Sequence, residues 1–272
     1  MIRLAQLSED LGYSHVWIGD SHLIWREAYV NMTAVALNTT KVRIGTGVTN
    51  PLTRHASVVA SAYATLEEFA PERFIVGIGL GDSSVETMGL RPARLSYFEK
   101  AVADMRALFA GNEAELESGK IHLLHPPKRR VPVYVAASGP KMLELAGRIA
   151  DGIIVLVGID DNYVRSARER IDAGAKAANR DPRQIEIVLW VPCIGKGPGQ
   201  GCGQGPRGAC RQTSSPFRAR RERTENSGRN PAGVQLLRAH AANGQPGAFR
   251  IGWWTSSRLP AHGPNAAPRS ND

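Results

Sequence analysis

Residues 42–55 read V-R-I-G-T-G-V-T-N-P-L-T-R-H, and this stretch sets the pattern for the rest of the chain. It opens as an apolar strand and then becomes rich in glycine at Gly45 and Gly47. Glycine inside a strand marks a bulge or a close approach to the backbone. The N-P pair that follows predicts a turn. The stretch therefore reads either as an ordinary strand-to-helix connection or as the edge of a ligand site, with the basic pair Arg54-His55 at its end.

Short apolar segments alternate with helical ones on both sides of this stretch. Such alternation predicts parallel strands joined by crossover helices. The predicted strands lie at residues 14–18, 42–46, 73–78, 133–136, 152–157 and 185–192. The predicted helices cover residues 2–11, 29–37, 56–69, 95–109, 140–150 and 162–178. Residues 113–131 fit this rhythm poorly, and we expect there an insertion with one excursion strand at 121–124.

The number of strands indicates an incomplete barrel. A (β/α)₈ barrel needs eight strands, and the pattern supplies six before residue 193. The chain starts with a helix, so we expect the first strand to be missing. The eighth should lie beyond residue 194. We therefore predict an α/β fold over residues 1–194, a TIM (β/α)₈ barrel that is incomplete because its first strand is missing and an irregular tail replaces its C-terminal strand.

Residues 195–272 differ from this domain in composition. Glycine and proline make up 21 of these 78 residues, against 24 of the first 194. Only residues 234–242 and 249–254 have the apolar character to build structure, because the remainder cannot bury enough surface to offset its ordering entropy. One interpretation is a disordered basic linker. The other, which we favour because the barrel is unfinished at the break, is a tail derived from a shifted reading frame.

Charge and cysteine content exclude several classes of protein. Residues 1–194 hold 22 basic and 22 acidic side chains, so the net charge of +9 belongs to the last 78 residues. We therefore expect no specific nucleic-acid partner. No apolar run approaches the ~18 residues of a membrane span, and no secretory leader is visible. The three cysteines form no CxxC pair, so we expect no metal site and a cytoplasmic location.

Five motifs together carry a resemblance to a known family. They are LGYSHVWIGD (11–20), GTGVTNPLTRH (45–55), FIVGIGLGD (74–82), PVYVAASGPKML (132–143) and AGRIADG (146–152). In order and spacing the chain resembles the luciferase-like flavin and deazaflavin oxidoreductases. It is most similar to the branch that uses the deazaflavin coenzyme F420, typified by methylenetetrahydromethanopterin reductase. The resemblance implies a luciferase-like TIM barrel with its site at the carboxyl ends of the strands.

The resemblance also implies a set of coenzyme-binding residues. The strand that ends in Gly47, Val48, Thr49 and Asn50 would carry a bulge behind the coenzyme ring, with a non-prolyl cis peptide bond between the first two. Thr49 and Asn50 would line the ring pocket.

A second loop would hold the coenzyme phosphate at the start of a helix. Its residues are Ala137, Ser138, Gly139 and Pro140. Free N–H groups and the helix dipole favour an anion there, although capping of the helix by Ser138 would explain the same residues.

Two carboxylates are the candidate catalytic residues. Asp20 and Asp82 each follow a predicted strand, where barrel enzymes build their sites. Each has an alternative role, Asp20 as an N-cap of the next helix and Asp82 as a cap of its loop. The family usually has histidine directly after the aspartate that matches Asp20, whereas this chain has Ser21 and then His22. Arg54 and His55 would either pair with an anion or tie down their loop.

These features predict an oxidoreductase that transfers a hydride between coenzyme F420 and a small organic substrate. A deazaflavin passes hydrides and does not activate oxygen, so the alternative of an FMN-dependent monooxygenase would need the other coenzyme. A further alternative is an inactive remnant. Family members are often dimers or larger, so a homo-oligomer is compatible with the resemblance.

Overall fold

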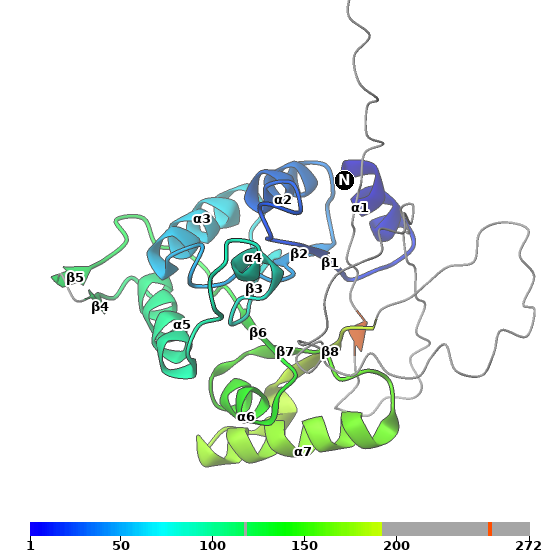
Figure 1. Cartoon of the computed structure of the whole chain (residues 1–272). Coiled ribbons are helices and arrows are strands. Elements are labelled where there is room, and N and C mark those ends of the chain that lie inside the picture. Colours follow the sequence, from blue (N-terminus) through cyan, green and yellow to red (C-terminus); the bar gives the residue numbers. More distant parts are fainter. Residues whose placement is uncertain (117–118, 192–249, 252–272) are drawn as a thin grey trace, which may run out of the picture.

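The computed structural model describes residues 1–116, 119–191 and 250–251. A curled, parallel sheet forms its centre, and helices cover the outer face of the sheet (Figure 1). The strand order is β1-β2-β3-β6-β7-β8-β9. The bounds of these strands are β1 His15–Ile18, β2 Arg43–Thr46, β3 Phe74–Ile78, β6 Val133–Ala137, β7 Gly152–Val155, β8 Glu186–Leu189 and β9 Arg250–Ile251. All six strands predicted before residue 193 are confirmed, and every pair in the sheet is parallel.

The helices between the strands also follow the predicted pattern. They are α1 Ile2–Asp10, α2 Ala28–Leu37, α3 Ala56–Phe69, α4 Ser83–Glu86, α5 Leu95–Phe109, α6 Pro140–Ile149 and α7 Asp161–Ala177, with a short 3₁₀ helix η1 Pro182–Gln184. Proline begins α6 at its first position, where its missing N–H costs nothing. Helix α4 was not predicted, since four residues carry no readable period.

The insertion differs from its prediction. Instead of one strand at 121–124, it forms an antiparallel hairpin of β4 Ala114–Leu116 and β5 Gly119–Ile121. In this hairpin Ala114 pairs with Ile121, so pairing ends where the excursion strand was expected to begin. The reason is that the partner strand β4, not the apolar run after residue 121, sets the register.

Beyond residue 191 the structure describes only β9, which pairs in parallel with β8 and falls inside the 249–254 segment expected to form structure. At this place a complete barrel would have its next strand, and β9 supplies two residues of one where an irregular tail was predicted to replace it. The other expectations for the tail, including its disorder and its origin in a shifted frame, concern residues 192–249 and 252–272 and lie outside the described residues.

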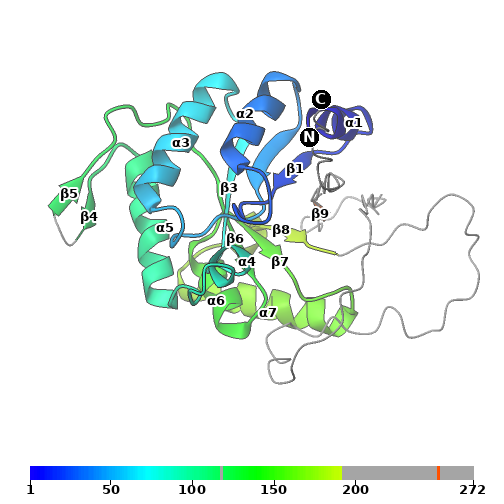
Figure 2. The same cartoon turned by 45° about the horizontal axis from the view of Figure 1, so that its top comes forward.

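Two apolar layers lie on opposite faces of the sheet. The outer core, between sheet and helices, holds Val16, Ile18 and most other buried residues. The second layer, here called the lumen cluster, lies on the concave face seen in Figure 2. Its buried members are Trp17, Ile75, Tyr134, Ile154 and Val188, with the partly buried Val48, Ala136 and Trp190 packed against them. Alternation along each strand assigns neighbouring residues to the two layers.

Glycines make room for the aromatic side chains of the lumen cluster. A Cβ atom on Gly45 would lie 2.4 Å from Cζ3 of Trp17, and one on Gly152 would lie 2.5 Å from the ring of Tyr134. A side chain at either position would displace a large buried ring. This is the close approach that glycine in the 42–55 stretch predicted.

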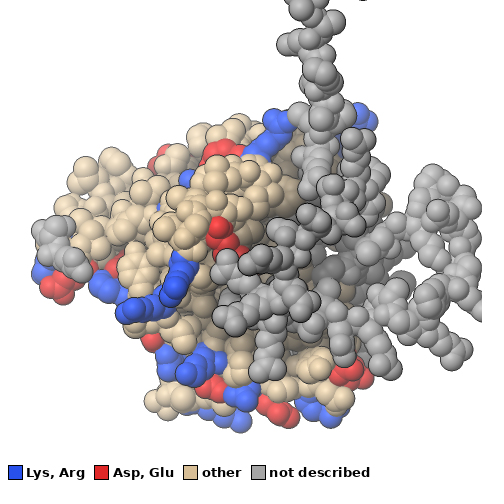
Figure 3. All heavy atoms as spheres, in the orientation of Figure 1, with Lys and Arg blue, Asp and Glu red and all other residues tan. Residues whose placement is uncertain are grey.

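The surface charges of the described domain are mixed in sign. Figure 3 shows acidic and basic side chains side by side along the lower edge, where α6 and α7 lie in Figure 1. Several of them form ion pairs, such as Arg170 with Glu144 at 2.7 Å and Arg168 with Asp172 at 2.7 Å. None of the helices in the described ranges is long and apolar enough to span a membrane.

Candidate functional site

The predicted site residues meet at the carboxyl edge of the sheet. Residues 19–27 follow β1, 47–55 follow β2, 79–82 follow β3 and 138–139 follow β6. In a parallel barrel this edge is where the loops build the active site.

A β-bulge forms at the end of β2, as the glycines predicted. Gly45 pairs with Ile75, but the next bridge joins Thr49 to Ile78, so four steps on one strand match three on the other. The Thr46 hydroxyl replaces a ladder bond, because it accepts from the N–H of Gly77 at 3.0 Å and donates to its carbonyl at 2.7 Å.

Only glycine fits opposite this bulge. A Cβ atom on Gly77 would lie 1.9 Å from the carbonyl oxygen of Thr46. The Gly47–Val48 peptide bond within the bulge is cis, as the resemblance implied.

Val48 presents its side chain to the concave face. It packs against the lumen cluster, and a Cβ atom on Gly79 would lie 3.1 Å from its Cγ2 and 3.5 Å from the Cβ of Ala136. Gly79 therefore keeps the space beside Val48 free of a side chain. Small residues around one apolar side chain leave room for a flat group.

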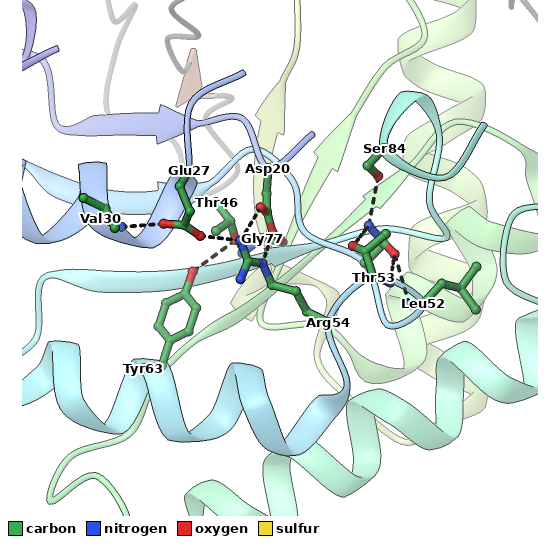
Figure 4. Close-up of polar contacts among 11 residues, drawn as sticks. Asp20, Glu27, Val30, Thr46, Leu52, Thr53, Arg54, Tyr63, Gly77 and Ser84 are labelled. Carbon is green, nitrogen blue, oxygen red and sulfur yellow. Dashed lines mark hydrogen bonds and ion pairs between the residues drawn. The ribbon is translucent and has the colours of Figure 1, made fainter. Parts of the chain in front are cut away.

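Thr49 and Asn50 do not present their side chains in the same way. Thr49 is fully buried and its backbone bonds Gly77 and Gly79, while its hydroxyl has no hydrogen-bond partner among the described residues. The amide of Asn50 donates to Thr53 Oγ1 at 2.8 Å and to Ser84 Oγ at 2.9 Å, and its oxygen accepts the N–H groups of Leu52 and Thr53 (Figure 4). The Asn50 side chain is thus bonded within the protein and that of Thr49 is not, and the part of both residues in a ring pocket stays a prediction.

Asp20 is held in a buried ion pair. Arg54 Nε donates to its Oδ2 at 2.8 Å and Arg54 Nη2 to its Oδ1 at 2.9 Å, while the Asp20 side chain is only 2% exposed (Figure 4). Arg54 also pairs with Glu27 and lies 4.4 Å over the ring of Tyr29. The four side chains join the loop after β1 to the first turns of α2 and α3.

The electrostatics of this cluster stabilise the charge of Arg54. Burial opposes the charge, but hydrogen bonds and charge from Asp20 outweigh it and raise the pKa of Arg54 above its ordinary value. Burial, followed by the charge of Asp20, raises the pKa of Tyr29, so its phenol stays protonated. Proton transfer by Asp20 would require its carboxylate to leave Arg54, and the catalytic role expected for Asp20 stays a prediction.

The N-caps of α2 and α3 decide between the alternative roles of the loop residues. Glu27, not Asp20, caps α2 by accepting from Val30 N at 2.7 Å. His55 caps α3, with its Nδ1 accepting from Ser57 N at 3.3 Å. Arg54 and His55 thus tie down their loop. His22 is exposed in the loop that precedes α2.

Asp82 lies at the start of α4 with an exposed side chain. It forms no side-chain cap of that helix, so the capping alternative is not realised. The next two residues anchor the turn, because Ser83 bonds Ser21 at 2.8 Å and Ser84 bonds Asn50. A carboxylate is therefore presented at the edge on a fixed turn, and its catalytic role stays a prediction.

The start of α6 is open. Gly139 is the N-cap residue and has no side chain with which to cap, so the alternative of an N-cap at Ser138 is wrong. Ser138, Gly139 and Pro140 are exposed and Ala137 is buried as the last residue of β6. Within the described part of the chain, no heavy atom lies within 4 Å of a Cβ placed on Gly139. The first-turn N–H groups of a helix have no intrahelical acceptor, and here no N-cap side chain accepts from them.

Sequence reasoning missed three residues near this edge: Glu27, Tyr29 and Trp190. Glu27 and Tyr29 lie 27 and 25 positions from their partner Arg54, and no local pattern signals the contact. Trp190 fell inside a predicted strand, where alternation alone could have placed it on the concave face.

Comparisons with known proteins agree with this architecture. The family model for luciferase-like monooxygenases matches residues 1–197. The 5,10-methylenetetrahydromethanopterin reductase of Methanolobus tindarius is 35% identical over 193 residues, which are 69% of this chain and 59% of that protein. The F420-dependent glucose-6-phosphate dehydrogenase of Kineococcus radiotolerans is 33% identical over 206 residues, 67% of this chain and 61% of that protein.

Solved structures show the same likeness. The coenzyme F420-dependent tetrahydromethanopterin reductase from Methanopyrus kandleri is 29% identical with a TM-score of 0.60, covering 69% of this chain and 61% of that one. An F420-dependent secondary alcohol dehydrogenase is 26% identical with a TM-score of 0.63, covering 70% and 63%. The chain thus spans about three fifths of the length of these relatives. By the match over residues 1–197, the chain belongs to the luciferase-like monooxygenase family.

Proposed function

We propose that the protein is an oxidoreductase that binds coenzyme F420 and transfers a hydride between it and a small organic substrate. The observation that carries this proposal is the pairing of two features at one edge of the sheet. The bulge presents the half-buried, apolar Val48 beside Gly79, which has no side chain, and the start of α6 has no side-chain cap for its N–H groups. The F420-dependent dehydrogenases and reductase to which the chain is similar support the choice of coenzyme.

The residues present fit such a coenzyme. Gly79 adds no side chain beside Val48 and Ala136, which suits the close approach of a flat ring system. Gly139 leaves the approach to α6 open, and Lys141 follows in its first turn, so an anionic group would meet N–H donors and a positive charge. When bound, the deazaflavin supplies the hydride chemistry.

The protein itself would orient the coenzyme and manage charge. Val48 and its bulge would set the position of the ring, and residues 138–140 would hold its anionic portion. Asp20 is held by Arg54 and would act through its field. Asp82 is exposed at the same edge and is the better placed of the two carboxylates to hold or pass a proton.

The substrate class is proposed only as a small organic molecule. The relatives' names specify chemically different substrates, a pterin derivative in one and a sugar phosphate in another.

A fluorescence titration of the purified chain with coenzyme F420, and in parallel with FMN, tests the proposal. We expect saturable binding of F420 at micromolar concentration and weaker binding of FMN. Preferential binding of FMN would favour the alternative of a monooxygenase. A folded protein that binds neither coenzyme would contradict the proposed function.

A further inference from the structure

Three half-buried side chains pack against the buried part of the lumen cluster on the concave face. They are Val48, Ala136 and Trp190, the partly buried members of the lumen cluster. Val48 follows β2, Ala136 lies in β6 and Trp190 follows β8, and these are the second, fourth and sixth strands of the sheet order. In a (β/α)₈ barrel each interior layer is contributed by alternate strands. We call these three residues the upper lumen layer.

The register of the strands supports this grouping. Leu189 pairs with Val155 and belongs to the outer core, so the next residue, Trp190, falls on the concave face. The N–H of Trp190 donates to the carbonyl of Val155 at 2.8 Å, which continues the ladder one residue beyond β8. The strand backbone therefore fixes the direction in which the indole leaves the sheet.

The upper lumen layer lies on top of a closed one. Trp17, Ile75, Tyr134, Ile154 and Val188 are each less than 5% exposed, so a ligand on the concave face would rest on the upper layer and not enter beneath it. Within that layer Ala136 is small and Val48 is the residue of the bulge. Trp190 supplies most of the contact area, because an indole buries far more surface than a methyl or isopropyl group.

Val48 and Trp190 also lie on opposite sides of the layer. Their strands are separated by four steps in the sheet order, from β2 through β3, β6 and β7 to β8. In an eight-stranded barrel four steps are half of the circumference. A flat ring placed beside Val48 would therefore meet the indole of Trp190 from across the lumen.

We propose that Trp190 is a ring-contacting residue of the coenzyme site and completes the surface on which the coenzyme ring lies. This inference rests on the proposed function, which supplies the flat ring. Aromatic side chains bind flat ring systems through buried area and through stacked or edge-to-face contact. The role requires an aromatic side chain at position 190 and a strand that holds it in place.

Binding measurements on three variants of the full chain test this inference, with coenzyme F420 as the probe. We expect Trp190→Ala to raise the Kd of F420 about tenfold, because the largest surface of the upper lumen layer is removed. Trp190→Phe should raise it about threefold or less, because a smaller aromatic ring remains. Leu189→Val is the matched control, since its neighbouring side chain faces the outer core, and its Kd should equal that of the wild type.

A second readout does not depend on affinity. Binding of F420 should quench tryptophan emission in the wild type, and a large part of this change should be missing in Trp190→Phe at saturating coenzyme. Circular dichroism and thermal unfolding establish that each variant is folded.

Three results would overturn the inference. The first is a folded Trp190→Ala variant with an unchanged Kd, and the second is equal weakening by Leu189→Val. The third is a wild type that binds no F420, which would remove the proposed function and this inference together. A wild type that binds F420 while Trp190→Ala binds equally well would remove this inference alone.

Discussion

Two loops at the carboxyl edge of the sheet use their polar groups in opposite ways. The loop from β2 to α3 is closed, because Asn50 bonds Leu52, Thr53 and Ser84, Arg54 holds Asp20 and Glu27, and His55 caps the helix. The loop from β6 to α6 is open, because its N-cap is Gly139 and its residues 138–140 are exposed. Both loops follow parallel strands and both lead into helices.

The difference separates the framework of the site from its binding surface. Buried polar groups that bond one another stabilise a loop. Removal of one partner leaves the other buried without a hydrogen bond, which lowers stability. Donors that remain unbonded at a helix start are ready to bind a ligand. Variants in the closed loop should therefore change stability, and variants in the open loop should change binding.

The largest expected effect is in the closed loop. Arg54→Ala leaves the Asp20 carboxylate buried without its bidentate partner, and we expect the free energy of unfolding to fall by about 3 kcal/mol. Chemical denaturation at pH 7 measures the change. The matched control is Arg148→Ala, whose ion pair with Glu99 is exposed on both sides and should change stability by less than about 1 kcal/mol. Equal effects of the two variants would contradict the difference between a framework pair and a surface pair.

The next effect is in the open loop and concerns binding. Gly139→Asp places a carboxylate at the N-cap of α6, where it should cap the helix without loss of stability and repel an anionic coenzyme. We expect the Kd of F420 to rise at least about tenfold, a change of about 1.4 kcal/mol, while the midpoint of thermal unfolding stays constant or rises. Gly139→Ser is the control, since it caps without charge. If Gly139→Asp binds F420 like the wild type, the open loop is not the anion site.

The smallest effect lies at the opposite end of α3 and is a pH dependence. Burial, the largest cause, raises the pKa of the Glu67 carboxyl above its ordinary value of 4.5. Hydrogen bonds from the backbone oppose this shift, and the nearby charge of Glu72 adds to it. The folded state therefore binds this proton more tightly than the unfolded state. The carboxyl thus adds stability as the pH falls from above its folded pKa towards 4.5.

Glu67→Gln removes this dependence and keeps an acceptor for the N–H of Glu72, which Glu67 Oε2 now binds at 2.9 Å. We expect the variant to be more stable than the wild type at pH 8, by no more than about 1 kcal/mol, and this advantage to shrink at pH 4.5. Urea unfolding at the two pH values measures both. A variant that is less stable than the wild type at pH 8 would show that the ionised carboxylate itself stabilises this end of α3.

The strands were predictable because their signals are local. Six apolar runs, the glycines at 45 and 47 and the proline at position 140 each act through neighbouring residues. The bulge was predictable for the same reason. The hairpin at 114–121 and the short helix α4 were not, since pairing with another segment or packing of a turn decides their bounds.

The same difference between local signals and tertiary packing applies to the candidate site. The sequence alone placed Asp20, Gly47, Asp82 and Gly139 after the ends of strands, because strand ends and glycines can be read along the chain. Whether each residue remains available could be decided only by packing. The fold brings Arg54 into contact with Asp20, Glu27 and Tyr29, although 25 or more positions of the chain separate Arg54 from each of them. The Asp20 carboxylate is thereby engaged in an ion pair. Beyond its chain neighbours, no side chain of residues 1–116 or 119–191 comes comparably close to Gly139, and none caps α6, so within this part of the chain its first N–H groups stay open to a ligand.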